Sequence, residues 1–229
     1  MGSRASKDRL FDGFAAIGKA LSSGRRLELL DVLSQGPRSV EQLAIQVNQS
    51  VANTSAHLRL LAGAGLVSTE RDGNRVVYSL VGPEVEVMWD ALRAAAEAHL
   101  GGLDRLASDY LGDRNELRVV SRPELADRLR TDDPPVLLDV RPAAEYAAGH
   151  IPGALSVPPD ELTVRLGAVP RNREVVAYCR GRFCAYADEA VRLLRRRRVR
   201  ARRLEDGFPE WRRDRLPVAV GRDESGGGE

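Results

Sequence analysis

Two cysteines lie close together in the segment YCRGRFCAYADEA, which runs from Tyr178 to Ala190. They are Cys179 and Cys184, the only cysteines of the chain, and four residues separate them. Two thiols at this spacing can bind a metal ion, form a disulfide, or act as a reactive thiol with a partner. A disulfide requires Cα atoms roughly 4.4–6.8 Å apart, a distance that a sequence does not reveal. All three chemistries therefore remain open at this point.

The position of Cys179 favours a nucleophilic thiolate. The apolar run EVVAYC, residues 174–179, predicts a buried strand, and residues 185–197 predict a helix. Ligand sites of parallel sheets lie at the carboxyl ends of strands, and a helix that begins there directs backbone N–H groups toward the same place. The positive charges of Arg180 and Arg182 further favour a thiolate. The pattern therefore predicts a nucleophilic thiolate that handles an anion.

Strands and helices alternate regularly around this loop. Strands are predicted at residues 117–120, 136–140, within 150–157, at 174–179 and at 199–204. Helices are predicted at residues 123–130, 143–148, 160–166, 185–197 and 208–213. Strands that are buried on both faces form continuous apolar runs, as VLLDV and EVVAYC do. Residues 117–220 are therefore predicted to form an α/β domain around a parallel sheet of about five strands.

The residues before this alternation are mostly helical. Helices are predicted at residues 10–22, 25–33, 40–47, 50–64 and about 83–110. Ser39 is predicted as the N-cap of the third helix, with Gln42 as its capping-box partner. Two β-rich runs flank Asp72-Gly73-Asn74, which is a strong hairpin signal. Helix, turn, helix and hairpin in this order predict a mainly α, winged helix-turn-helix domain.

The helix predicted at 50–64 has one apolar and one polar side. The residues that share the inward side are Val51, Ser55, Leu58, Leu61 and Ala62. Short polar side chains on the other side suit base-edge readout in a major groove. The hairpin carries an arginine on each side of its tip, where a wing meets the DNA backbone or minor groove. The predicted DNA-binding residues are Gln49, Ser50, Asn53, Thr54, His57, Arg59, Arg71 and Arg75.

The segment AIQVNQSVANTSAHLRLLAGAGLVSTERDGNRVVYSL resembles the DNA-binding core of the ArsR-type transcriptional repressors, over roughly residues 10–100. The resemblance implies a winged-helix homodimer that dimerises through its first and last helices and binds a palindromic double-stranded DNA operator. Many members of that family sense metals through cysteines in the helix before the recognition helix. This chain has no cysteine before residue 179, which excludes a thiolate metal site there. No spacing pairs His57 with His99, so neither a metal nor a cofactor is predicted.

The segments LLDVRPAAEYAAGHIPGALSV and VVAYCRGRFCAYADEAVRLL, with DGFPEW and LPV, resemble a single rhodanese domain over residues 117–220. The resemblance implies that Cys179 takes a sulfane sulfur from a small donor, such as thiosulfate, polysulfide or a persulfide, and carries it as a persulfide. The loop residues expected to surround that sulfur and the charged group of the donor are Arg180, Gly181, Arg182, Phe183 and Cys184. Asp139 and Arg141 match a DxR segment expected to support the site, and an ordinary surface ion pair is the alternative.

Cys184 departs from most sulfurtransferase loops, which end in Thr or Ser at this position. The departure suggests a resolving thiol that attacks the persulfide of Cys179 and yields a di- or trisulfide. The alternative is a small side chain that only packs. The related phosphatases need an Arg six positions after the cysteine, where this chain has Ala185, so phosphatase or arsenate-reductase chemistry of that type is disfavoured. A zinc site is disfavoured too, because only two soft ligands are local.

Composition limits the remaining possibilities. The 229 residues are 43% hydrophobic and 30% charged, and a net charge of +2 leaves DNA binding to locally placed cations. No apolar run approaches the roughly 18 residues that span a bilayer, so no membrane partner is expected. Two cysteines do not make a disulfide framework for a protein of this size, so a reducing cytoplasm is the expected location. The basic run RRRRVRARR, residues 195–203, is interpreted as a helix end and an edge strand rather than a DNA contact. The predicted domains are 1–110 and 117–220, with a linker at 111–116 and a flexible tail at 221–229.

Two functional hypotheses follow. In the first, a DNA-binding repressor senses or carries reactive sulfur as a persulfide on Cys179, and this chemistry shifts the dimer between DNA-binding and non-binding states. In the second, the chain is a thiosulfate or persulfide sulfurtransferase whose DNA-binding half regulates its own expression. A catalytically idle second domain is disfavoured, because the thiol is present.

Overall fold

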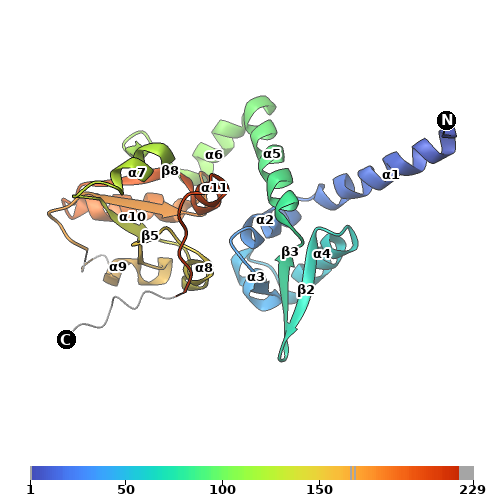
Figure 1. The fold of residues 1–229 in the computed structure, drawn as a ribbon, viewed down its shortest axis with the longest axis horizontal. Coiled ribbons are helices and arrows are strands. Elements are labelled where there is room, and N and C mark those ends of the chain that lie inside the picture. Colours follow the sequence, from blue (N-terminus) through green and yellow to red (C-terminus); the bar gives the residue numbers. More distant parts are fainter. Residues whose placement is uncertain (1, 166, 168, 222–229) are drawn as a thin grey trace. The chain divides into compact units, whose positions relative to one another are not determined.

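A computed structural model describes residues 2–165, 167 and 169–221 (Figure 1). The chain divides into two compact units between Leu100 and Gly101, and each is described by itself. This division lies ahead of the predicted linker at 111–116, which the structure assigns to the second unit. The predicted tail lies outside the described residues, except for Gly221. In the part of the chain that is described, no helix has both the length and the apolar character needed to cross a membrane.

The first unit packs helices around a small antiparallel sheet. Its elements are α1 (Arg4–Leu21), α2 (Gly24–Leu33), β1 (Arg38–Ser39), α3 (Val40–Gln46), α4 (Val51–Gly63), β2 (Val67–Asp72), β3 (Arg75–Leu80) and α5 (Pro83–His99). The strand order is β1-β3-β2, and β1 was too short to be predicted. The hairpin turns at Gly73, whose φ of +57° suits a residue without Cβ.

Local signals explain where these helices begin and how they pack. Ser39 caps α3 as predicted: its Oγ accepts the Gln42 N–H, and the Gln42 side chain accepts the Ser39 N–H at 2.9 Å. The core of the unit is formed by apolar side chains on α2, α3 and α4 that are fully buried: Leu29, Leu30, Leu43, Leu58 and Leu61. The predicted long helix at 83–110 is interrupted, because Gly102 adopts a left-handed conformation (φ +86°) between α5 and the next helix.

The second unit is an α/β fold. Its elements are α6 (Leu103–Leu111), β4 (Val119–Val120), α7 (Arg122–Arg128), β5 (Val136–Asp139), α8 (Ala143–Ala148), β6 (Leu155–Ser156), η1 (Pro159–Glu161), α9 (Leu162–Arg165), β7 (Val175–Cys179), α10 (Ala185–Arg196), β8 (Ala201–Gly207) and α11 (Phe208–Arg213). The five strands pair in the order β4-β8-β7-β5-β6, and every pairing is parallel. The predicted multidomain fold class is therefore confirmed, a winged helix-turn-helix followed by an α/β unit with a parallel sheet.

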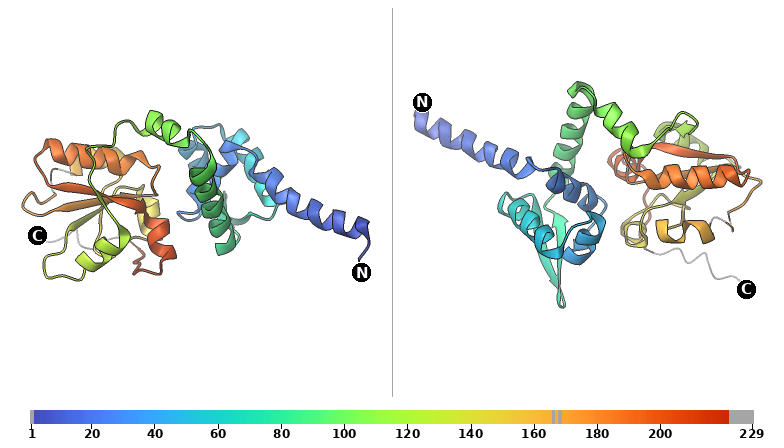
Figure 2. Two further views of the ribbon diagram at one scale, coloured as in Figure 1. Left: turned by 90° about the horizontal axis from the view of Figure 1, so that it is seen from above. Right: turned by 180° about the vertical axis from the view of Figure 1, so that it is seen from behind.

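The central strand β7 sends side chains to both faces of the sheet, and helices cover both faces (Figure 2). Val175, Ala177 and Cys179 pack in the cluster that includes apolar residues of α10. Val176 and Tyr178 pack in the other cluster, with residues of α7, α8 and α11. The two-residue periodicity of a strand thus places Cys179 on the same face as the helix that follows it.

Candidate functional site

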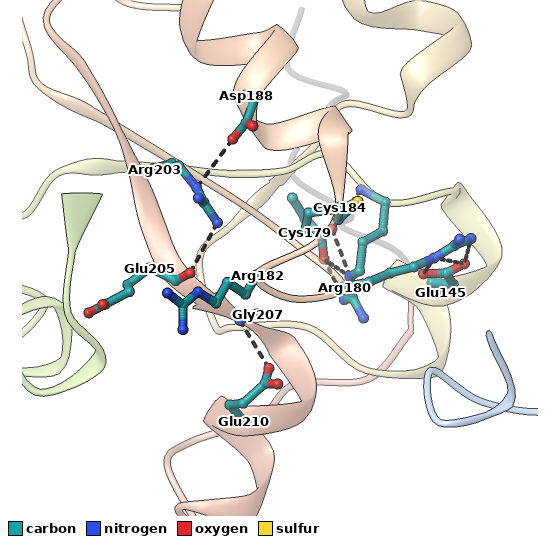
Figure 3. The surroundings of a disulfide bond; sticks show 12 residues. Glu145, Cys179, Arg180, Arg182, Cys184, Asp188, Arg203, Glu205, Gly207 and Glu210 are labelled. Carbon is teal, nitrogen blue, oxygen red and sulfur yellow. Dashed lines mark hydrogen bonds and ion pairs between the residues drawn. A yellow bond between two sulfur atoms is a disulfide. The ribbon is translucent and has the colours of Figure 1, made fainter. Parts of the chain in front are cut away.

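The loop between β7 and α10 carries both cysteines (Figure 3). Cys179 is the last residue of β7 and is only 1% exposed, while Cys184 is the N-cap of α10. Their sulfur atoms are joined in a disulfide, with the two Cα atoms 6.3 Å apart. The Cys184 N–H donates to the Gly181 carbonyl at 3.1 Å and closes the loop. Of the three chemistries that the spacing allowed, the structure shows the disulfide, and it brings the sulfurs into the bonding contact that thiol–disulfide exchange requires.

The two arginines of the loop have different surroundings. Arg180 is half-buried, and its Nε donates to both carboxylate oxygens of Glu145 on α8, at 3.1 and 3.0 Å. The Glu145 side chain is fully buried, so its negative charge matches the guanidinium of Arg180. Arg182 is exposed. The Arg180 side chain is therefore directed to Glu145, while the expectation that the loop surrounds a bound anion stays a prediction.

A third arginine, Arg114, holds the loop from outside. Its Nη1 donates to the Arg182 carbonyl at 2.8 Å, its Nη2 to the Cys184 carbonyl at 3.4 Å, and its Nε to the buried carboxylate of Asp188. Arg203 on β8 lies 3.3 Å from the other oxygen of Asp188. Burial lowers the pKa of Arg203, while the charge of Asp188 acts in the opposite direction. Two guanidinium groups thus share one carboxylate at the start of α10, which leaves positive charge beside the disulfide.

The strand β8 approaches the loop more closely than any side chain would permit. A Cβ added to Gly207 would lie 2.3 Å from the backbone nitrogen of Gly181 and 2.6 Å from the Arg180 carbonyl oxygen. The Gly207 N–H donates to the Glu210 carboxylate at 3.0 Å, which fixes the end of β8 against α11. Glycine at 207 therefore allows the backbone of the loop to rest directly on β8.

Asp139 and Arg141 form a buried ion pair at the end of β5. Both side chains are fully buried, which makes the surface ion pair considered above wrong. The Arg141 Nε donates to Asp139 at 2.9 Å, and its Nη2 donates to the Gly149 carbonyl at 2.7 Å. The Arg141 guanidinium also stacks 4.2 Å from the ring centroid of Phe208. Although burial alone lowers the pKa of Arg141, the charge of Asp139 raises it overall. Through these contacts Arg141 links the end of β5 to Gly149 after α8 and to Phe208 of α11.

The winged helix exposes most of the predicted DNA-binding side chains. Ser50 caps α4, and its Oγ accepts the Asn53 N–H at 3.2 Å. The predicted residues that are exposed are Ser50, Asn53, Arg59, Arg71 and Arg75, while Gln49 and His57 are half-buried. The His57 Nδ1 is buried and has no hydrogen-bond partner among the described residues.

Thr54 has to be removed from the predicted DNA-binding set. It is fully buried, and its hydroxyl donates to the Ser50 carbonyl at 3.0 Å. Val51 was predicted to face inward, but it is 46% exposed. The buried side of α4 is therefore formed by Thr54, Leu58 and Leu61, so the helix is rotated relative to the predicted face.

Comparisons with known proteins find a matching family for each of the two units. Residues 23–69 match the model of the arsR family of bacterial regulatory proteins, and residues 121–214 match that of the rhodanese-like domain. The HTH-type transcriptional regulator Rv0324 of Mycobacterium tuberculosis is 41% identical over 215 residues, which cover 94% of each chain. This chain is an ArsR-type transcriptional regulator with a rhodanese domain.

Other similar proteins cover one part of the regulator. A sulfurtransferase of Allochromatium vinosum is 33% identical over 101 residues, which cover 44% of this chain and 94% of that protein. A solution NMR structure of the homodimeric winged helix-turn-helix domain of Mb0332 from Mycobacterium bovis is 38% identical. It covers 44% of the regulator and 93% of its own chain, with a TM-score of 0.41.

The sequence did not predict that Glu145 and Arg114 contact the cysteine loop of the regulator. Glu145 lies on a helix of six residues, and its partner is 35 positions away. Arg114 lies in the segment predicted as a linker, although Leu111 nearby is buried. His150 is structural: its ring stacks on Tyr146 with centroids 3.7 Å apart, and its Nδ1 lies 2.9 Å from the Tyr146 carbonyl. Among the residues that the structure describes, no three His, Cys, Asp or Glu side chains are grouped to hold a metal ion.

Substitution of Gly207 tests the contact between the loop and β8 in the regulator. We expect Gly207→Ala to lower the free energy of unfolding of the second unit by about 1–3 kcal/mol, because the loop must move away from the added Cβ. Denaturant titration measures this change, and alkylation of the reduced protein at Cys179 should become faster. Gly167→Ala is the matched control, since a Cβ there meets nothing within 4 Å. Equal unfolding curves for the two variants would refute the role given to Gly207.

Proposed function

We propose that the regulator is a repressor that responds to reactive sulfur, and that the loop from Cys179 to Cys184 is its sensor. The observation that supports this proposal is the pairing of Cys179 with Cys184 in one disulfide at the start of α10. A sulfurtransferase needs a free nucleophile in each cycle, whereas a sensor needs two stable states of the same loop. A pair of cysteines in bonding contact supplies two such states, the dithiol and the disulfide.

The proposed reaction starts from the reduced loop. The Cys179 thiolate attacks the outer sulfur of a persulfide or polysulfide donor. The donor's S–S bond breaks, a thiolate leaves, and Cys179 becomes a persulfide. The Cys184 thiolate then attacks the inner sulfur, Sγ of Cys179, and hydrosulfide leaves. The two electrons of the dithiol thus reduce the sulfane sulfur to sulfide, and the loop ends as the disulfide seen in the structure.

The charges around the loop support an anionic donor. Arg114 and Arg203 share the single carboxylate of Asp188, and Arg182 is exposed at the loop. The N-terminus of α10 adds the positive end of a helix dipole at Cys184. Persulfides, polysulfides and thiosulfate are anions, so this surplus of positive charge favours their approach and the thiolate form of the nucleophile.

We further propose that the regulator is a homodimer bound to a palindromic DNA operator. The exposed polar face of α4 would enter the major groove with Ser50 and Asn53, and Arg71 and Arg75 of the hairpin would contact the backbone or minor groove. Helix α1 supports the dimer, because it exposes Leu10, Phe11 and Phe14 by 56%, 57% and 63%. Large apolar side chains grouped in this way are typical of an interaction surface.

The decisive experiment compares loop chemistry with DNA binding in the same samples. The reduced full-length protein is exposed to polysulfide, thiosulfate, sulfide or peroxide, and each product is analysed by mass spectrometry and by binding to its operator. We expect the persulfide and the Cys179–Cys184 disulfide to appear with polysulfide, together with operator affinity weakened by about 5–150-fold. Equal operator affinity of the dithiol and disulfide forms would contradict the sensor.

A sulfurtransferase remains the second candidate, because a sulfurtransferase is 33% identical over 44% of the chain. Steady-state transfer of sulfur from thiosulfate to cyanide distinguishes the two proposals. Sustained turnover favours the enzyme, whereas a single turnover that ends in the disulfide favours the sensor.

A further inference from the structure

A second positively charged site lies at the amino ends of the strands, whereas the cysteines lie at their carboxyl ends. It is a pocket of about 440 Å³ between the end of α10 and the first residues of β7 and β8. Its charged lining residues are Arg118, Glu174, Arg195, Arg198, Arg200 and Arg202. Neither the arsR family nor the chemistry of the cysteine loop accounts for five arginines and one glutamate in one concavity.

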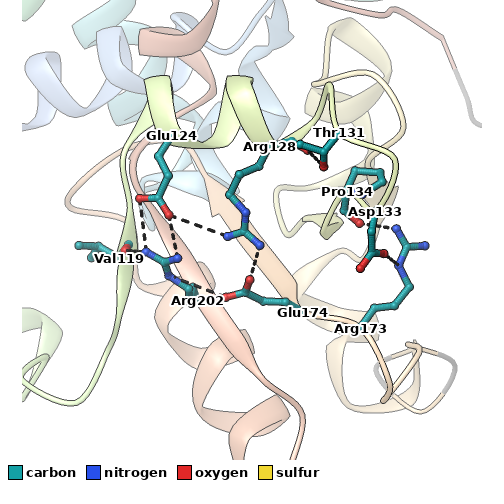
Figure 4. A network of polar contacts seen from close by, with 9 residues as sticks. All are labelled: Val119, Glu124, Arg128, Thr131, Asp133, Pro134, Arg173, Glu174 and Arg202. Atoms are coloured by element: carbon teal, nitrogen blue, oxygen red, sulfur yellow. Dashed lines mark hydrogen bonds and ion pairs between the residues drawn. The ribbon is translucent and has the colours of Figure 1, made fainter.

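Two glutamates at this pocket, Glu124 and Glu174, are paired with arginines (Figure 4). Glu174 forms ion pairs with Arg128 and with Arg202, the latter at 3.9 Å. Glu124 pairs with Arg202 at 2.8 Å. The single glutamate that lines the pocket is therefore shared between two arginines and does not neutralise the others.

In the part of the chain that the structure describes, the other four arginines of the pocket have no carboxylate partner. Arg195 donates to the backbone carbonyl of Glu116, which leaves its charge unmatched. Arg118, Arg198 and Arg200 are exposed, and within the described residues their side chains have no hydrogen bond or ion pair. A concave surface of one sign concentrates the electric field and attracts counter-ions.

For residues 195–203 the sequence pattern predicts a helix end and an edge strand without a DNA contact, but β8 lies inside the sheet between β4 and β7. Against that interpretation, we propose that this basic pocket binds phosphate groups of double-stranded DNA and gives the second unit a sequence-independent affinity for DNA. Guanidinium groups match phosphate oxygens with two parallel N–H donors, and the unmatched cations here are all arginines. The first unit, which is part of the same chain, belongs to a family of DNA-binding regulators. Because both units are joined in one chain, DNA bound by the first unit raises the concentration of phosphates around the second. This inference does not depend on the sulfur chemistry.

The test is the salt dependence of DNA binding by the full-length protein. The dissociation constant for a duplex of unrelated sequence is measured over a range of salt for the wild type and for Arg198→Gln/Arg200→Gln. Each phosphate contact contributes a slope of about 0.9 in log K against log salt. We expect the slope of the variant to be lower by about 1–2. Between about 50 and 200 mM salt, each contact removed then makes the fold-loss of affinity roughly threefold smaller than in the wild type.

The matched control is a second double variant, which removes the same number of positive charges and also changes one arginine in a left-handed conformation. Arg215 is exposed and adopts a left-handed conformation (φ +57°), like Arg198 (φ +63°), and Arg130 is an exposed arginine outside the pocket. Arg130→Gln/Arg215→Gln should leave the slope unchanged. Arg118→Gln, on a separate segment, should lower it by about 1. Equal slopes in wild type and pocket variants, or an equal decrease in the control, would overturn the proposal.

Discussion

Cys179→Ser should abolish the response of the regulator to reactive sulfur. A serine hydroxyl at the end of β7 cannot attack sulfane sulfur, because the reaction requires a thiolate. After exposure to polysulfide, mass spectrometry should find no disulfide within the loop, and any sulfur added to Cys184 should stay there, because no second thiol can displace it. Operator affinity should stay at the level of the reduced wild type, whereas that of the wild type falls by about 5–150-fold.

Cys184→Ser is the matched control, since it removes the other half of the same disulfide. This variant should gain one sulfur atom on Cys179 and stop there, because no second thiol releases hydrosulfide. If its operator affinity then equals that of the oxidised wild type, the persulfide alone is the signal, and if not, the disulfide is. A Cys179→Ser protein that still left its operator with polysulfide would exclude Cys179 as the sensing thiol.

Arg141→Met should destabilise the second unit by about 3–5 kcal/mol, because it leaves the Asp139 carboxylate buried without its cation. Methionine fills much of the space of arginine, so loss of charge is the main change. Trp211 is buried in the second unit, and its fluorescence in a Trp89→Phe background reports the unfolding of that unit in urea. Trp89 belongs to the first unit, on α5.

Two further variants show whether the buried charge is responsible. Asp139→Leu combined with Arg141→Met should recover part of the lost stability, since neither charge then remains unpaired. Arg130→Met removes an exposed arginine that pairs with Asp127, and it should change stability by less than about 1 kcal/mol. A loss as small as this in Arg141→Met would mean that the ion pair does not hold β5, α8 and α11 together.

The sequence predicted those features of the regulator that depend on neighbouring residues. The capping box of Ser39 and Gln42, the hairpin at Gly73 and the apolar runs of β5 and β7 are all local patterns. The end of β7 in turn placed Cys179 at the carboxyl edge of a parallel sheet. Fold class and the position of the loop followed from such patterns, because the periodicity of an element is set by its own backbone.

The other features depend on contacts between distant parts of the chain. Arg114 meets Asp188 across 74 positions, and no composition or spacing marks such a pair. The pairing of Arg180 with Glu145 and the close approach of Gly207 to the loop are set by how strands and helices pack. Thr54 was misassigned for a related reason, since a polar residue on a helix can be buried when its hydroxyl bonds to the carbonyl one turn earlier.

The contacts of Arg114 also determine where the second unit can be cut out or recombined. The similarity to the rhodanese-like domain begins at residue 121, yet the folded unit begins at Gly101 and includes α6. A fragment that starts at residue 117 would contain both cysteines, but it would lack the guanidinium that holds the carbonyls of Arg182 and Cys184. A transplanted sensor should therefore carry α6 and Arg114 with it, because a domain cut at the edge of the family similarity would keep the nucleophile and lose the group that holds its loop.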